Sequence, residues 1–459
     1  MPAVLSAAAE ALAAGASEAA AREAPWAGEA EADDGDDAAA EALQRRAEAD
    51  ARAAAAAVRA AAARPTVYDC AGQVVRVHPI SNSLPDHLFV AAVPRKTVGF
   101  AENMPGNAST YVFRTEATYL GHYRRSLYGV TRKKTGWDSG RHLEIMASGA
   151  VPFFVDIDAL PPQTLSFYPS DLIRRAMALP GVRACAGGAD DGRWYLNREN
   201  FWVGAGFNVS EYREVAAAIL AHARAHLSAS AMAAHVLRTM GVDDAAARPL
   251  LFVTHCSEDF TADSLLFGFQ RLLGADAVVD ASFDTEGMEH PWCDDAHRGE
   301  RRKPLLYAAA DNDPGTNRFS LRGSHADSPR ISRERLEERL AAREFGAVIF
   351  GSASRTTSLL PTVREHYPPS RVAFVYGEDM PYPLNAGWPY EGIQRPVGSR
   401  APLPSTADAS RWGVVFQREL YEAAADAPHR HQTLMVPGVA DVVERSWREP
   451  LSTGACTDD

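Results

Sequence analysis

Short apolar runs alternate with helical patterns over residues 249–379, and this alternation constrains the fold more than any other feature. Apolar runs occupy 249–255 (PLLFVTH), 277–283 (AVVDASF), 345–353 (FGAVIFGSA) and 371–379 (RVAFVYGED). The intervening segments include SLLFGFQRLLG, which is closed by Gly274, and the charged amphipathic segment 331–344. Strands that alternate with helices predict a mostly parallel, doubly wound α/β sheet.

An earlier segment has the same character. The run at 150–157 (AVPFFVDI) lies between Gly149 and Asp158 and is typical of a buried strand. Helical spacing precedes it at 139–148 and follows it from Ser170, and a long helical region covers 210–239. We therefore predict two Rossmann-like α/β lobes, over residues 65–245 and 246–459.

The remaining segments differ in composition from these two lobes. Residues 1–64 are dominated by Ala, Glu, Asp and Arg and lack large apolar residues, so they are expected to form a disordered or helical arm, more typical of a solubilising tail than of a binding segment. Residues 284–330 are polar and indicate an insertion. The tail from about 385 is rich in Pro and Gly, with a helix expected around Val415 to Ala424.

Charge and cysteine content exclude several classes of partner. The net charge of −12 over 459 residues argues against nucleic acid as a partner, because phosphate neutralisation needs clustered cations. The five cysteines are widely spaced, without a CxxC pair, which favours reduced thiols. No apolar run reaches about 18 residues, and the first residues lack a secretory pattern. We therefore expect no transmembrane segment and a cytoplasmic location.

Candidate site residues concentrate in the segment 123–165. A sugar-nucleotide needs cations for its diphosphate, a carboxylate for its hydroxyls and an apolar wall for its base. Each position also has a plain structural interpretation: the TRKK run as a solvated patch, Arg141 and Glu144 as a surface ion pair, Trp137 as core. The candidate donor-binding residues are Lys133, Lys134, Trp137, Arg141, Glu144 and Gly149, with Arg132 and Tyr128 beside them.

The sequence GWDSGRHLEI at 136–145, followed by ASGAVP at 147–152, resembles the donor-half signature of exostosin-like glycosyltransferases. The resemblance extends over about 119–165. It implies a GT-B-like fold, in which Arg141 contacts the donor diphosphate and Glu144 contacts the ribose or sugar. It also implies an inverting transfer that uses a nucleotide-sugar as co-substrate and a glycan as acceptor. In this chain the donor-like lobe comes first in the sequence, the reverse of the usual GT-B order.

An inverting transfer also needs a base for the acceptor hydroxyl, and ligands of open α/β sheets bind at the carboxyl ends of strands. His255 and Asp259, which follow the run at 249–255, are the candidate catalytic residues. His255 could instead be a buried imidazole and Asp259 a helix cap. Glu378 and Asp379 follow the strand at 371–379 in the same way. Asp156 and Asp158 are interpreted as polar groups at a strand end, and no metal is expected.

The leading hypothesis is thus a metal-independent glycosyltransferase without a cofactor, and the alternative is a non-catalytic protein that binds a sugar or a nucleotide. The chain has neither GxGxxG nor GxxxxGK[ST], which argues against NAD-dependent enzymes and P-loop kinases. We expect alanine at Arg141 or Glu144 to weaken donor binding while leaving thermal unfolding nearly unchanged.

Overall fold

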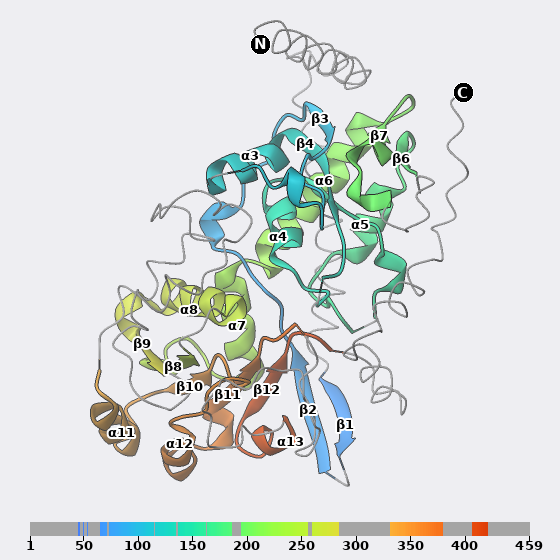
Figure 1. Ribbon diagram of the computed structural model, residues 1–459. Helices are drawn as coiled ribbons and strands as arrows, with labels where there is room; N and C mark the ends of the chain where they lie inside the picture. Colours follow the sequence, from blue (N-terminus) through green and yellow to red (C-terminus); the bar gives the residue numbers. More distant parts are fainter. Residues whose placement is uncertain are drawn as a thin grey trace, which may run out of the picture.

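The computed structural model describes residues 65–70, 73–113, 115–134, 136–161, 163–185, 194–255, 259–283, 331–379 and 406–420, with three isolated positions at 45, 49 and 53. The expected insertion at 284–330, and the arm apart from those three positions, lie outside the described residues. Two units are stacked one above the other, each built on its own sheet (Figure 1).

The larger sheet has seven strands in the order β1-β2-β12-β11-β10-β8-β9, and only β1 is antiparallel to its neighbour. The mostly parallel sheet predicted from the sequence is therefore confirmed. Its strands are β1 (Thr66–Cys70), β2 (Gln73–Pro79), β8 (Leu250–His255), β9 (Val278–Phe283), β10 (Ala347–Phe350), β11 (Val372–Tyr376) and β12 (Val414–Gln417).

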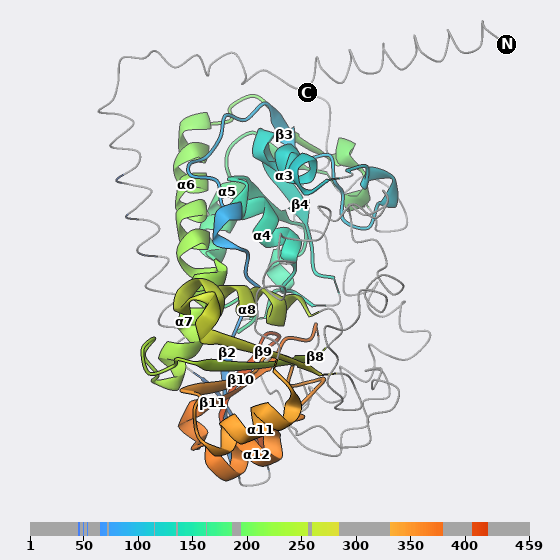
Figure 2. The same cartoon turned by 90° about the vertical axis from the view of Figure 1, so that its left-hand side faces the viewer.

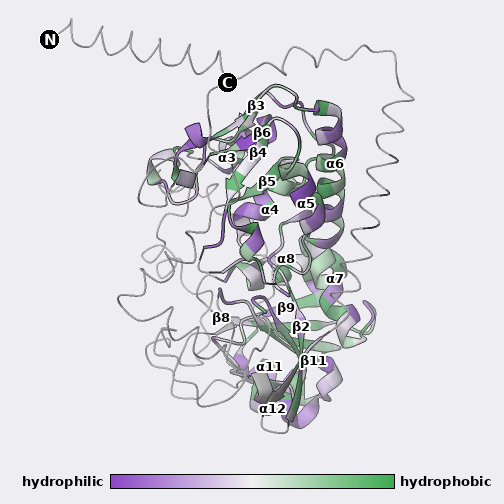
Figure 3. Ribbon diagram, turned by 90° about the vertical axis from the view of Figure 1, so that its right-hand side faces the viewer, coloured by the Kyte–Doolittle hydropathy of each residue, from purple (hydrophilic) through white to green (hydrophobic). Residues whose placement is uncertain are grey.

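Both faces of the larger sheet are buried. Along β8, Leu250 and Phe252 belong to one core cluster, whereas Leu251 and Val253 belong to the other. The first face is covered by α7 (Ala229–Met240) and α8 (Phe260–Leu273), and the second by α11 (Arg333–Ala341) and α12 (Leu360–His366) (Figure 2). The short helix α13 (Thr406–Ala409) also packs on the second face. Strands buried on both faces are continuously apolar, and Figure 3 shows this in the central strands.

The smaller unit contains the parallel sheet β3-β4-β5 and the antiparallel pair β6-β7. The aromatic side chains of Phe100, Tyr128 and Phe153 pack together across the three parallel strands. The elements are β3 (Val98–Phe100), α3 (Glu116–Arg125), β4 (Ser126–Thr131), α4 (Gly140–Ala147), β5 (Val151–Phe154), α5 (Ser170–Met177), β6 (Val182–Ala184), β7 (Phe201–Val203) and α6 (Val209–His226).

The first two strands do not lie in the unit where the sequence placed them. Residues 66–79 were expected in the first lobe, but β2 pairs with β12 in the larger sheet, with Val77 opposite Val415. The smaller unit is thus inserted between β2 and α7, and the larger sheet is discontinuous in sequence. Nothing local to β1 or β2 could reveal this, because β12, which joins β2 to the larger sheet, lies more than 300 residues away in the chain.

Two further expectations are corrected, and one is confirmed. The helix expected around Val415 is the strand β12, which gains its backbone hydrogen bonds from two parallel neighbours, and the rest of that segment lies outside the described residues. The helical region expected at 210–239 is confirmed, as the successive helices α6 and α7, and Ser228 caps the second of them. Cys185 is disulfide-bonded, so reduced thiols are not found at this position.

Candidate functional site

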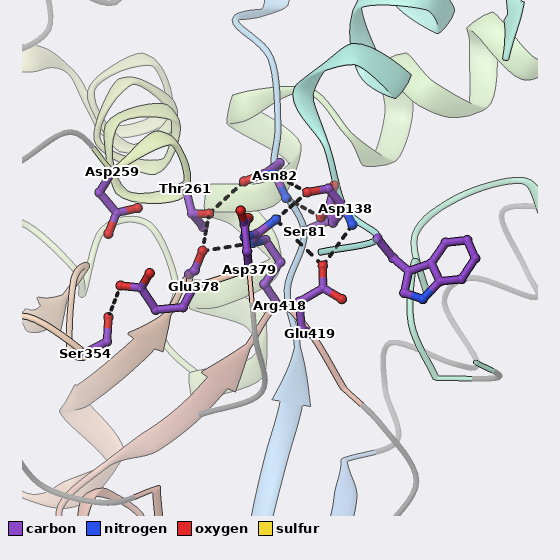
Figure 4. A network of polar contacts seen from close by, with 12 residues as sticks. Ser81, Asn82, Asp138, Asp259, Thr261, Ser354, Glu378, Asp379, Arg418 and Glu419 are labelled. Carbon is purple, nitrogen blue, oxygen red and sulfur yellow. Dashed lines mark hydrogen bonds and ion pairs between the residues drawn. The ribbon is translucent and has the colours of Figure 1, made fainter. Parts of the chain in front are cut away.

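The carboxyl ends of strands from both sheets converge between the two units. Ser81 follows β2, Arg418 follows β12, and Asp138 lies on the loop that connects β4 to α4. Figure 4 shows these residues in one network with groups that follow β8, β10 and β11. Because ligands of parallel sheets bind beyond the carboxyl ends of the strands, this junction is the candidate site.

Asp138 is the centre of the junction. Its Oδ2 accepts hydrogen bonds from Ser81 Oγ at 2.6 Å and from the backbone N–H of Asn82 at 2.8 Å, while Oδ1 accepts one from Tyr168 OH at 3.0 Å. Burial raises the pKa of this carboxyl group, and the nearby Arg418 opposes the shift. Asp138 therefore attaches the smaller unit to the segment that leaves β2.

Arg418, which follows β12 in the larger unit, reaches the loop of the smaller unit with its side chain. Its side chain is only 3% exposed, and it donates hydrogen bonds to the backbone carbonyls of Gly377 and Asp138 and to the carboxylate of Asp379 (Figure 4). Buried guanidinium groups are stable only with such partners. Arg418 thus links β11, β12 and the loop before α4.

Glu419 is fully buried beside Arg418. Its Oε1 accepts a hydrogen bond from the backbone N–H of Asp138 at 2.9 Å, and its Oε2 has no hydrogen-bond partner among the described residues. Burial raises its pKa to about 7 against the opposing effect of Arg418. A carboxyl group that changes charge near neutral pH therefore lies at the contact between the units.

Lys133 and Asp156 lie at the ends of β4 and β5. The backbone N–H of Lys133 donates to Asp156 Oδ2 at 2.9 Å, and Asp156 Oδ1 has no partner in the described part of the chain. Burial raises the pKa of Asp156 to about 6. Burial lowers the pKa of Lys133, whereas Glu419 and Asp156 act to raise it. The ammonium group of Lys133 therefore interacts with carboxyl groups from both units.

A second polar cluster lies at the switch point of the larger sheet, between the neighbouring strands β8 and β10. The next strand after β8 is added on one side of this point, and the next strand after β10 is added on the other side. Asp259 Oδ2 accepts a hydrogen bond from Ser352 Oγ at 2.9 Å and lies 3.9 Å from Arg355 Nε. Arg355 Nε also donates to Glu378 at 2.8 Å. Burial alone would raise the pKa of Glu378, but Arg355 and Ser354 lower it overall.

The two residues predicted as catalytic have different environments. Asp259 Oδ1 accepts from the backbone N–H of Ala262 at 3.1 Å and caps α8, as the structural interpretation expected. With Ser352 on its other oxygen, both carboxylate oxygens of Asp259 accept hydrogen bonds from within the protein. His255 is the last residue of β8, half-buried and opposite Phe283 on β9.

Arg141 and Glu144 are buried, at 3% and 2% exposure, on the side of α4 that faces α3. Arg141 Nη2 donates to Tyr111 OH at 3.3 Å, and Glu144 Oε2 accepts from Tyr119 OH at 2.8 Å. The structural alternative of a surface ion pair is wrong. Because both side chains are buried, alanine at either position is now expected to lower stability as well as donor binding, contrary to the expectation from the sequence.

The other predicted donor-binding residues are dispersed. Trp137 is 3% exposed and belongs to the main core cluster, which is its structural interpretation. Lys134 is exposed, one residue from Lys133. Gly149 follows the end of α4 with a φ of 68°. A Cβ there would lie 2.8 Å from Pro94 Cδ, so the backbone of Gly149 packs closely against another segment of the protein.

His142 fixes the loop that carries Lys133 and Asp138. Its Nε2 is 2.8 Å from the backbone carbonyl of Trp137, and its Nδ1 is 2.7 Å from Thr131 Oγ1. Because a carbonyl only accepts, Nε2 carries the proton and the Thr131 hydroxyl donates to Nδ1. Burial lowers the pKa of His142 to about 3, so the neutral tautomer persists at neutral pH.

Gly136 brings this loop against the larger sheet, since a Cβ would lie 2.5 Å from Glu419 Oε1 and 2.8 Å from the Asp379 carbonyl oxygen. We expect Gly136→Ala to lower the free energy of unfolding by about 1–3 kcal/mol, because backbone must move to admit the methyl group. Urea unfolding checks this against Gly121→Ala on α3, where nothing lies within 4 Å. Equal stability of the two variants would show that the loop contact is loose.

Sequence reasoning missed Ser81, Asn82, Asp138, Arg418 and Glu419. Asp138 lies within the motif at 136–145, which was the one available signal. No strand was predicted before Ser81, and a helix was expected where Arg418 and Glu419 lie. Among the described residues, no group of His, Cys, Asp and Glu has the arrangement to hold a metal ion. Within the same residues, every helix is too short or too polar to cross a membrane.

Comparisons with protein-family models, with curated proteins and with solved structures find no match for this chain. Its function is therefore inferred from the geometry of the junction.

Proposed function

We propose that this protein transfers a glycosyl group from a nucleotide-sugar to a hydroxyl acceptor, and that both substrates bind between the carboxyl edges of its two sheets. The observation that carries the proposal is the convergence of Lys133, Asp156 and Glu419 from β4, β5 and β12. A cation beside two carboxyl groups of raised pKa supplies both a partner for a diphosphate and a proton acceptor.

The facing edges also support the GT-B-like arrangement implied by the resemblance to exostosin-like glycosyltransferases. In that arrangement the smaller unit is the donor-binding lobe, with the motif at 136–152 on its loop and on α4. The usual order of the lobes is altered here in a specific way. The larger sheet begins with β1 and β2 and is completed only after the smaller unit.

The test is nucleotide release from a panel of UDP-sugars and GDP-sugars, with mono- and oligosaccharide acceptors supplied. Acceptor-dependent release with formation of a glycoside would support the transferase. A protein with neither nucleotide binding nor release would contradict the proposal.

The second candidate is a non-catalytic protein that binds a sugar or a nucleotide. The observation that favours it is the engagement of Asp259, a predicted base, with Ser352 and the α8 N-terminus. Tight binding of UDP or GDP without turnover of any donor, over all acceptors, would support this candidate over the transferase.

Lys133→Ala should weaken UDP or GDP binding by at least about tenfold, because a hydrogen bond to a charged group contributes roughly 1.5–3 kcal/mol. Isothermal titration calorimetry measures this change. Arg95→Ala removes an exposed cation from the same unit and should bind as the wild type does. Unchanged affinity in the Lys133 variant would remove this lysine from the donor site.

A further inference from the structure

Four buried carboxyl groups lie at the carboxyl ends of the strands or on the loop that faces them: Asp138, Asp156, Asp259 and Glu419. A base must have an oxygen that can accept a hydrogen bond from the acceptor hydroxyl. Both oxygens of Asp138 and both oxygens of Asp259 already accept hydrogen bonds from side chains or backbone of the protein. Donors of the protein thus already engage both oxygens of each of these two carboxylates, which gives Asp138 and Asp259 a structural role.

Glu419 Oε2 has no hydrogen-bond partner among the described residues, but this carboxyl group is enclosed by the protein. Its side chain is 0% exposed, and it lies directly against Gly136 on the loop of the smaller unit. A substrate could reach it only if the contact between the units opened. Glu419 therefore belongs to that contact rather than to the reaction.

Asp156 combines a carboxylate oxygen that lacks a hydrogen-bond partner among the described residues with a position less enclosed than that of Glu419. The backbone N–H of Lys133 holds Oδ2 at 2.9 Å and so fixes the plane of the carboxylate, while Oδ1 has no partner among the described residues. The residue is 8% exposed, more than Asp138, Asp259 or Glu419. A buried carboxylate oxygen without a hydrogen bond is costly, and a catalytic role is one of the explanations for such an atom in a native structure.

We propose that Asp156 is the catalytic base of the transfer, an assignment that rests on the proposed function. Its Oδ1 takes the proton of the acceptor hydroxyl as that O–H bond breaks. The acceptor oxygen forms a bond to the anomeric carbon of the donor sugar. The bond from that carbon to the phosphate oxygen breaks, the nucleoside diphosphate leaves with the electron pair, and the proton on Asp156 later passes to water.

Entry of the hydroxyl requires a local movement, because Oδ1 itself is covered in the unliganded arrangement. Movements of loops around a site when substrate binds are common in enzymes of this size. The loop 132–134 is the neighbour that would move with Lys133, whose N–H anchors Oδ2.

The charge environment agrees with this role. Burial raises the pKa of Asp156 to about 6, and the Lys133 N–H, Arg132 and the Lys133 ammonium act against that rise. Glu419 lies beyond Lys133, and Arg174 on α5 binds the carbonyl of the next residue, Ile157. Because the base acts only when deprotonated, kcat/KM should rise with pH through about 6 and level off above it.

Asp156→Asn keeps an amide oxygen for the Lys133 N–H but has no basicity. We expect kcat to fall by about 100-fold or more, with the Kd for UDP or GDP changed less than about twofold, and the limb of the pH profile near 6 to disappear. The control is Asp158→Asn, two residues away, where the side chain is 71% exposed. The control should retain the wild-type kcat and pH profile.

Thermal unfolding of each variant identifies a folding defect. If the asparagine variant does not fold, Asp156→Glu, which retains a carboxyl group, should fold and keep a pH limb, shifted in position. Loss of that limb in the glutamate variant would overturn the assignment. A folded asparagine variant with more than a tenth of the wild-type kcat would overturn the assignment of Asp156 but leave the proposed function intact. A wild type that turns over no donor would overturn the proposed function and, with it, the role of Asp156.

Discussion

Arg418→Met should lower the free energy of unfolding by about 3–5 kcal/mol, because removing one partner of a buried ionic network leaves the others uncompensated. The side chain of Arg418 is 3% exposed and binds the carbonyls of Gly377 and Asp138 and the carboxylate of Asp379. Methionine fills most of the volume but satisfies none of these oxygens. Buried Glu419 and Asp138 would also lose the positive charge that favours their ionised forms.

Urea unfolding followed by tryptophan fluorescence measures this loss. Arg411→Met is the matched control, since Arg411 is 60% exposed and lies 4.0 Å from Asp408 in a surface ion pair. Exposed pairs contribute about 0–1 kcal/mol, so the control should unfold near the wild type. A loss below about 1 kcal/mol for Arg418 would show that the two units are not held together by this network.

Glu419→Gln should change how the free energy of unfolding depends on pH, while the free energy of unfolding at low pH should change less. The pKa of Glu419 is raised by burial to about 7 in the folded protein, from an ordinary value of 4.5 in the unfolded chain. Between these values the folded state binds more protons, so stability contributed by this group is present below pH 4.5 and lost as pH rises to about 7. The full difference corresponds to about 3 kcal/mol.

Glutamine stays neutral and can still accept the Asp138 N–H, so the variant should gain stability over the wild type as pH rises from 5 to 8. Unfolding midpoints in urea across that range provide the measurement. Glu365→Gln, where the side chain is 75% exposed, should give a curve parallel to the wild type. Parallel curves for Glu419→Gln as well would mean that this carboxyl group keeps one charge state over the whole range.

Local sequence periodicity was sufficient for most of the described helices and strands. The apolar runs at β8, β10 and β11 and the amphipathic segment at α11 encode burial in the spacing of their own residues. Strand β12 was misread because a four-residue apolar run has no distinguishable period. Its conformation depends on pairing with β2 and β11, which the sequence does not display locally.

The candidate site was only partly predictable. The segment around Lys133 was visible because it concentrates cations beside an apolar strand, and Asp156 was visible as a strand end. The burial of Arg141, the anchoring of Asp156 by a backbone N–H and the engagement of Asp259 were not visible, because each depends on contacts that the spacing of residues does not specify.

The sequence by itself determined that this chain forms parallel strands separated by helices, because the side chains of each segment must bury an apolar face with the period of that element. The tertiary structure alone decided that β1 and β2 complete the later sheet, and that Asp138, Arg418 and Glu419 meet. The physical reason is that hydrogen bonds and charges act through space, over distances of a few ångström, between residues that can be more than 300 positions apart in the chain, as in the pairing of β2 with β12.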